Sequence, residues 1–147
     1  MGSSAGKLLQ TLTKAIDRPS TIAFDSARGL VVVANREPQL GSGGSGSVAV
    51  YSPGSDTPTK VLKSTADPVS VAFDASGKIY VANEDAGIGI YAPNRAKPLR
   101  TIPDEYGMEV PRVLAFDPSG NLYVETDPPP SVPKTTCTSC RSSLLVN

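Results

Sequence analysis

The motif Ala-Phe-Asp occurs three times along the 147-residue chain, and this repeat constrains the fold more than any other feature of the sequence. Its phenylalanines are residues 24, 73 and 116, so the copies are 49 and 43 residues apart. Self-similarity at a period in the forties indicates that one supersecondary unit is repeated. The copies are expected to stack on one another, because a single unit cannot bury its apolar face alone.

Each unit is predicted to consist of short β-strands. The Phe-Asp pair is followed by Ser or Gly residues and then by a β-branched or aromatic run, such as residues 79–83. Aspartate hydrogen-bonds its own backbone and glycine adopts positive φ, so this segment predicts a tight turn between two strands. Two further runs follow in the first copy, at 47–51 and 59–63, and in the second, at 87–91 and 98–102. Because no helical periodicity is sustained, we expect an all-β fold whose four-stranded antiparallel sheets are arranged as β-propeller blades.

The repeat also sets the expected domain organisation. Residues 1–126 are predicted to form a partial propeller of about two and a half to three blades, and residues 127–147 a Pro-rich irregular tail. Residues 7–12 resemble the fourth strands and are predicted to be a single strand that ends a preceding blade. Residues 143–146 are a candidate for one additional strand. The blade repeats are expected near residues 19–63, 68–102 and 111–126.

The repeat pattern breaks in the third copy, where Glu125 and Thr126 replace the Ala-Asn of the earlier copies and a Pro-rich segment follows. Proline cannot donate the hydrogen bonds of an inner strand. We therefore hypothesise that the chain is a truncated or frame-shifted product of a longer gene. The Gly/Ser tract at 41–46 is interpreted as a hairpin insertion, because it lacks the lysine and the helix of a phosphate-binding loop.

Residues 71–83 contain the pattern Val-Ala-Phe-Asp-x-x-Gly-x-Ile-Tyr-Val-Ala-Asn, and Ile-Gly-Ile-Tyr-x-Pro follows at 88–93. This pattern resembles the NHL/YVTN-type β-propeller repeat, and the resemblance covers roughly residues 7–126. The family implies a bacterial propeller of about six blades that is often secreted or surface-attached. A chain with about half of those blades is then expected to be a piece of a longer propeller, or one half of a homodimer that closes a six-blade ring.

Composition excludes several classes of function. Fourteen Lys and Arg balance fourteen Asp and Glu, and no basic run occurs, so nucleic-acid binding is not expected. No apolar stretch approaches the roughly 20 residues of a membrane span. Histidine, the commonest general base and metal ligand, is absent. The N-terminus has no apolar core of a signal peptide, whereas relatives of the resembling type are often exported, so the location of the protein is left open.

Side chains at strand ends are the weak candidates for a metal site. Asn83, Glu84 and Asp85 lie together after the second strand of the second copy, and Asn35 and Glu37 lie at the matching place in the first copy. A resemblance to gluconolactonase-type propellers implies that such oxygen ligands bind calcium or another divalent cation. The alternative, which we favour, is that they are turn residues and that the protein has neither a cofactor nor a catalytic residue.

Asp25, Asp74 and Asp117 recur in register. Each precedes a turn, so we predict one turn cap per blade, spaced apart around the ring, in preference to a ring of calcium ligands. Cys137 and Cys140 form a CxxC in the tail without the βαβ context of a redox motif. We interpret this as an incidental pair, with a local disulfide or a zinc site shared between two chains as alternatives. Four strand tyrosines are predicted to pack between blades or to cap a sheet face: Tyr51, Tyr80, Tyr91 and Tyr123.

These observations favour a non-enzymatic module for binding or protein interaction. The repeats carry no nucleophile–base pair and no cluster of metal-ligand residue types that stands out from the pattern. The alternative is a divalent-cation-dependent lactonase-like or lyase-like propeller enzyme. The two differ in whether acidic and Asn side chains from several blades converge on one channel. Whether the ligand is a protein or a small molecule does not follow from the sequence.

Overall fold

The computed structural model of the chain describes Leu8 and residues 10–36, 45–63, 67–84, 86–103, 110–127 and 142–146. These residues contain eleven β-strands and no helix. Consequently, none of the described segments is a helix that is long and apolar enough to cross a membrane. The prediction of an all-β protein is confirmed.

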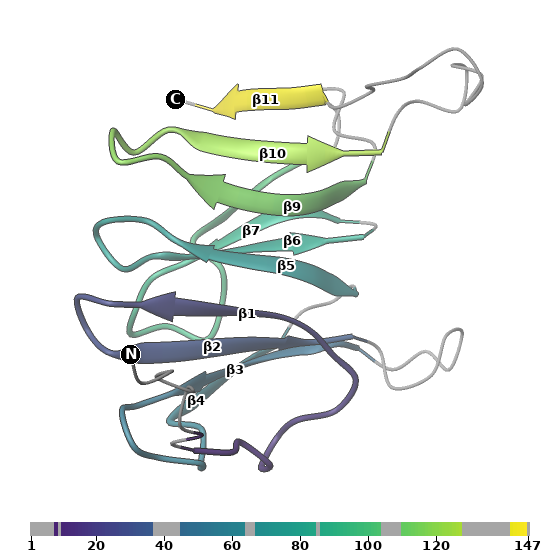
Figure 1. Ribbon diagram of the computed structural model, residues 1–147. Helices are drawn as coiled ribbons and strands as arrows, with labels where there is room; N and C mark the ends of the chain where they lie inside the picture. Colours follow the sequence, from purple (N-terminus) through teal and green to yellow (C-terminus); the bar gives the residue numbers. More distant parts are fainter. Residues whose placement is uncertain are drawn as a thin grey trace, which may run out of the picture.

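The strands form three antiparallel sheets, one for each copy of the repeat (Figure 1). The first sheet contains β1 (Pro19–Asp25), β2 (Leu30–Asn35), β3 (Ser47–Tyr51) and β4 (Lys60–Lys63), paired in sequence order. The second sheet contains β5 (Pro68–Phe73), β6 (Ile79–Asn83), β7 (Gly87–Tyr91) and β8 (Arg100–Ile102). The third sheet is built on β9 (Pro111–Phe116) and β10 (Leu122–Thr126), and β11 (Ser142–Val146) adds to the free edge of β10.

The first two strands of each copy form a hairpin, whose turn is one residue longer in the first copy than in the other two. In each copy the phenylalanine of Ala-Phe-Asp is paired with the first or second residue of the following strand, as Phe73 is with Ile79. The intervening turn contains a glycine with positive φ, which is 67° at Gly29, 82° at Gly77 and 88° at Gly120. Residues with a Cβ rarely adopt this conformation. The recurrence of glycine after the Phe-Asp pair is therefore a requirement of the turn.

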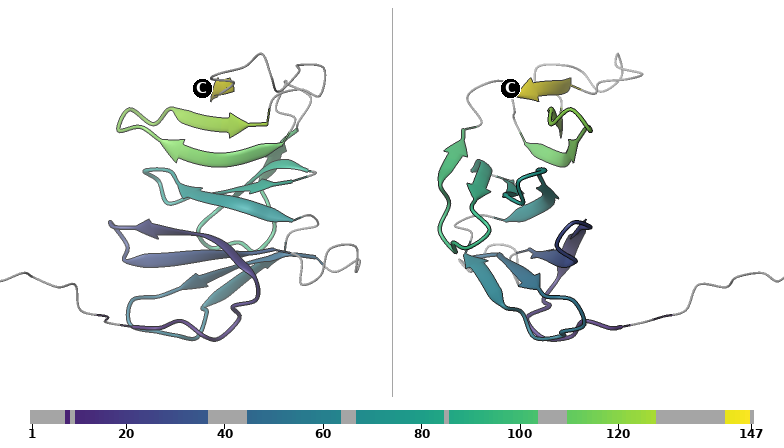
Figure 2. Two further views of the ribbon diagram at one scale, coloured as in Figure 1. Left: turned by 45° about the vertical axis from the view of Figure 1, so that its right-hand side comes forward. Right: turned by 90° about the vertical axis from the view of Figure 1, so that its left-hand side faces the viewer.

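The sheets stack face to face, with the second between the first and the third (Figures 1 and 2). The first strands of the repeats, β1, β5 and β9, lie side by side through the stack. We call the face of a sheet that is turned toward the preceding repeat its front face, and the opposite face its back face. Successive side chains of a strand alternate between the faces. In β6, Ile79 and Val81 are on the front face, whereas Tyr80 and Ala82 are on the back face.

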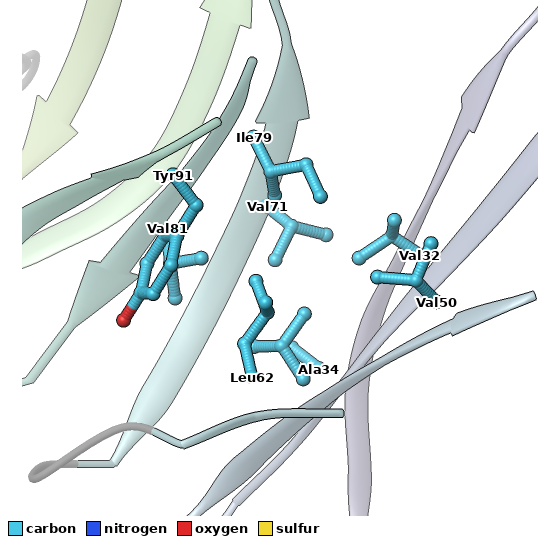
Figure 3. Close-up of a cluster of buried hydrophobic side chains, with 9 residues drawn as sticks. Val32, Ala34, Val50, Leu62, Val71, Ile79, Val81 and Tyr91 are labelled. Carbon is cyan, nitrogen blue, oxygen red and sulfur yellow. The ribbon is translucent and has the colours of Figure 1, made fainter. Parts of the chain in front are cut away.

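An apolar cluster joins the back face of the first sheet to the front face of the second (Figure 3). Leu62 of β4 is fully buried in this cluster together with Val32 of β2, and Val71 and Tyr91 of the second sheet complete it from the other side. β-Branched side chains suit such a half-buried pleated surface. Removal of this apolar surface from water is the main favourable contribution to the packing of the two sheets.

A second cluster joins the second sheet to the third. Ala82 and Ile88 meet Leu122 and Val124 there. Beside them, the rings of Tyr80 and Phe116 pack edge to face, with centroids 4.9 Å apart and an interplanar angle of 72°. Among the four strand tyrosines, the prediction of packing between sheets holds for Tyr80 and Tyr91. Tyr51 is buried under residues 10–18, which we call the N-terminal segment, and Tyr123 is exposed.

The ends of the chain differ in part from the expectations. Residues 142–146 form β11, because β10 offers them a free edge to pair with; the candidate strand at 143–146 is thus confirmed, and this part of the tail is not irregular as predicted. The strand predicted over 7–12 is absent from its described residues, Leu8 and 10–12, which belong to no sheet. A strand needs an edge to pair with, and Leu12 instead packs against the front face of the first sheet.

Candidate functional site

Two of the three proposed metal ligands of the second copy, Asn83 and Glu84, make contacts within the protein. Asn83 is buried, and its Nδ2 donates a hydrogen bond to the Val81 carbonyl at 3.3 Å. The Glu84 carboxylate forms ion pairs with Arg36 and Arg112, the latter at 3.2 Å. Asp85 and Glu37 lie outside the described residues, as do Cys137 and Cys140. Within the described part of the chain, no group of three or more Asp, Glu, Cys or His side chains is placed to hold a metal ion.

A network of ion pairs connects all three sheets at one end of their strands. Arg36, which follows β2, contacts both Asp67 and Glu84 of the second repeat. Arg112 of β9 contacts Glu84 and also Asp127, at 2.7 Å. The hydrogen bond that Arg36 donates to Asp67 raises the pKa of the Arg36 guanidinium, whereas burial lowers it; the net effect of the surroundings is to raise this pKa. Because these side chains are partly exposed, the network orients neighbouring sheets more than it stabilises them.

The three recurring aspartates cap their own turns. Asp25 Oδ1 accepts hydrogen bonds from the Ala27 and Arg28 amides, at 3.0 and 3.2 Å. Asp74 Oδ1 accepts one from the Lys78 amide at 2.8 Å, and Asp117 Oδ1 one from the Asn121 amide at 2.9 Å. This is the geometry expected of turn caps. The three turns are not spaced far apart, however, because together with the adjoining phenylalanines they line one hollow of about 300 Å³.

The cap at Asp74 predicts a contribution to stability that depends on pH. Burial is the largest single effect on its pKa and raises it, but hydrogen bonds from Ser76 and the Lys78 amide, with the Lys78 charge, outweigh burial and lower the pKa below the ordinary 3.8. A carboxylate whose pKa is lowered by folding stabilises the protein above its unfolded pKa, and this stabilisation is lost as the pH falls through the folded value. Below about pH 4, the melting temperature of wild type is therefore expected to fall more steeply with decreasing pH than that of Asp74→Asn. Parallel pH profiles of the two proteins would contradict the assignment.

The front face of the first sheet is apolar, and the part of it that β1 forms is open. Ile22 is 65 % exposed and Phe24 is 64 % exposed, although both are apolar residues of the strand β1. Their counterparts in the second repeat are Val71 and Phe73, and Val71 is only 5 % exposed because the first sheet covers it. The first sheet has no described sheet in front of it, so the same kind of surface remains accessible.

A groove of about 640 Å³ follows this open face. The N-terminal segment forms one wall, where Leu12 and Ile16 pack against Val33 and Tyr51. Apart from Gln10, its lining side chains are apolar or bear a hydroxyl group, and none is charged. The groove therefore suits an apolar surface better than a charged ligand.

Polar contacts hold the N-terminal segment to the first sheet. The Tyr51 hydroxyl donates to the Lys14 carbonyl at 2.6 Å. The Asn35 side chain donates from Nδ2 to the Ala15 carbonyl at 3.0 Å, and its Oδ1 accepts from the Asp17 backbone N–H at 3.0 Å. Asn35, predicted as a turn residue or metal ligand at a strand end, is in fact the buried anchor of this wall.

The residues of this groove are not among the site residues that the sequence predicted. The sequence of a strand does not show whether another sheet covers its apolar side chains. The available signal was the register of the repeat, in which Ile22 and Phe24 match residues that face the preceding unit. No protein-family model and no curated protein matches this sequence. The function proposed below rests on the repeat and on the geometry of the groove.

Proposed function

We propose that the chain is a partial β-propeller of NHL/YVTN-like repeats and a non-enzymatic module that binds protein through the open front face of its first sheet. Three features support the propeller assignment. The strands of each sheet are paired in sequence order, the three first strands lie side by side, and each sheet packs face to face on the next. Successive blades of a propeller are related in this way.

The observation that carries the binding function is the match between the open front face and a buried one. Ile22, Phe24 and Val31 take the register positions of Val71, Phe73 and Ile79, which are covered by the back face of the first sheet. The open face thus has the composition of a sheet-to-sheet interface without the second sheet. Contiguous exposed apolar surface of this kind marks interaction sites in soluble proteins.

A metal screen separates this function from that of a cation-dependent enzyme. We expect the melting temperature to be unchanged by calcium, magnesium, manganese or zinc, because the Glu84 carboxylate is already paired with two arginines. A cation present at 100 times its dissociation constant would add roughly 2.7 kcal/mol to the stability of the folded state, which is a shift of several degrees. Such a shift, abolished in Glu84→Gln, would favour the lactonase-like or lyase-like alternative.

The binding face itself is tested with the apolar-surface dye ANS on dilute protein. Wild type is expected to enhance the dye fluorescence, and Ile22→Ser to reduce the enhancement, because Ile22 lines the groove. Leu99→Ser is the control, since Leu99 is also exposed but lies outside the groove. Equal dye binding by the three proteins would contradict the proposed face.

A further inference from the structure

The stack of sheets presents two complementary faces that no described sheet covers. At one end lies the front face of the first sheet, and at the other the back face of the third (Figure 2). Between them the chain makes the same back-to-front contact twice, first to second sheet and second to third. The two open faces are therefore the two halves of a third contact of the same kind.

The exposed aromatic residues at the two ends match a pair that is formed inside the molecule. Tyr123 is paired with Ala115 across the hairpin as Tyr80 is with Ala72, so Tyr123 takes the place of Tyr80 on the back face. Phe24 has the same motif position as Phe116. Tyr80 and Phe116 pack together within the chain, whereas Tyr123 and Phe24 are 41 % and 64 % exposed. The chain thus contains the components of a second Tyr–Phe pair at its opposite ends.

The N-terminal segment covers part of the front face of the first sheet. In the first-to-second contact, Leu62 of the fourth strand packs in the cluster that contains Tyr91. In front of the first sheet, Leu12 packs in the cluster that contains Tyr51, the counterpart of Tyr91. The N-terminal segment therefore already takes the place of a fourth strand. The third sheet has the three strands β9, β10 and β11 and no described fourth strand.

We propose that the third sheet of a second copy covers the open front face of the first sheet, and that the reciprocal contact closes a ring of six sheets, three from each chain. Tyr123 of one copy packs on Phe24 of the other, and residues 10–12 lie at the outer edge of the incoming sheet. This inference rests on the proposed function, for which it names the partner. Two identical contacts related by a twofold axis form a closed assembly.

Glu125 is one of the residues that distinguish this contact from the two internal ones; Val113 is another, because it takes the position of Ser70, whose Oγ accepts a hydrogen bond from the Leu114 amide of the next sheet. Glu125 takes the back-face position of Ala34 and Ala82, both of which are fully buried between sheets. A carboxylate brought to an apolar face must be desolvated or turned aside, which costs affinity. The contact between copies is thus weaker than the internal contacts, and Glu125→Ala is expected to strengthen it by restoring the residue used inside the chain.

Light scattering behind a sizing column, over a range of protein concentrations, tests the dimer. We expect wild type to have twice its chain mass of 15.2 kDa. Phe24→Ser and Tyr123→Ser are each expected to raise the dissociation constant by more than about tenfold, since both remove an aromatic ring from the contact. Glu125→Ala is expected to lower it several-fold, and Leu99→Ser to leave it unchanged.

Several results would overturn the ring. One is a wild-type chain that stays monomeric at every concentration, and another is a dimer that neither aromatic substitution weakens. A third is a set of assemblies whose mass keeps growing with protein concentration, because contacts that do not close a ring give open assemblies. Circular dichroism shows whether the serine variants fold, and Glu125→Ala tests the contact without removing an apolar group. The dye experiment separates the two proposals. If dye binding depends on Ile22 while the protein is monomeric, the binding face stands and the second copy does not.

Discussion

Replacing Leu62 with alanine is expected to lower the free energy of unfolding by about 3 kcal/mol, which is a large part of the stability of a small domain. Leu62 is fully buried between the first and second sheets, where β4 contributes it to the cluster around Val71 and Tyr91. Truncation leaves a cavity that the surrounding strands cannot fill without losing their pairing. Urea denaturation followed by circular dichroism, at one protein concentration, measures the loss.

The same substitution at Leu99 is the matched control. Leu99 lies just before β8 and is 47 % exposed, so Leu99→Ala is expected to change the free energy of unfolding by no more than about 0.5 kcal/mol. Similar losses in the two variants would mean that Leu62 is not buried between stacked sheets. The comparison therefore tests the stacking of the repeats as well as one side chain.

Replacing Asn35 with alanine is expected to cost about 2 kcal/mol and to loosen the N-terminal segment. The Asn35 side chain is 2 % exposed and satisfies the Asp17 amide and the Ala15 carbonyl at once. Without it, these backbone groups lose their partner at the wall of the groove. Hydrogen exchange at the Asp17 amide is expected to accelerate by more than the loss of global stability accounts for.

Asn94→Ala provides the control for this change. Asn94 is exposed in the turn between β7 and β8, so its replacement is expected to leave both stability and exchange at Asp17 unchanged. If Asn35→Ala lowered global stability without a selective effect at Asp17, the role of Asn35 as the anchor of the segment would be wrong.

The repeat allowed most of the described strands to be predicted, because turn chemistry and strand composition are local properties. The turn after Asp74 illustrates this, since its cap and its glycine follow one another in the sequence. The pairing of β11 with β10 could not be predicted with the same security. Residues 142–146 carry no repeat motif, and only the free edge of β10 gives them a partner.

The candidate site was less predictable because it depends on which face a neighbouring sheet covers. Glu84 was a plausible metal ligand in the sequence, but stacking brings Arg36 and Arg112 from the adjacent repeats to its carboxylate. Ile22 looks like a core residue in the sequence, and it is exposed because no described sheet lies in front of β1. Both outcomes are set by contacts between repeats that are far apart in the chain.

The contact between the rings of Tyr80 and Phe116 gives the most direct test of the central claim, that consecutive repeats form sheets stacked face to face. The chain has five tyrosines and three phenylalanines, so its aromatic proton resonances are few enough to assign. With centroids 4.9 Å apart, the two rings are expected to give strong nuclear Overhauser effects. Their absence, in a protein that still shows the effects between Phe116 and Leu122 within the third sheet, would mean that the sheets form without stacking and would contradict the account.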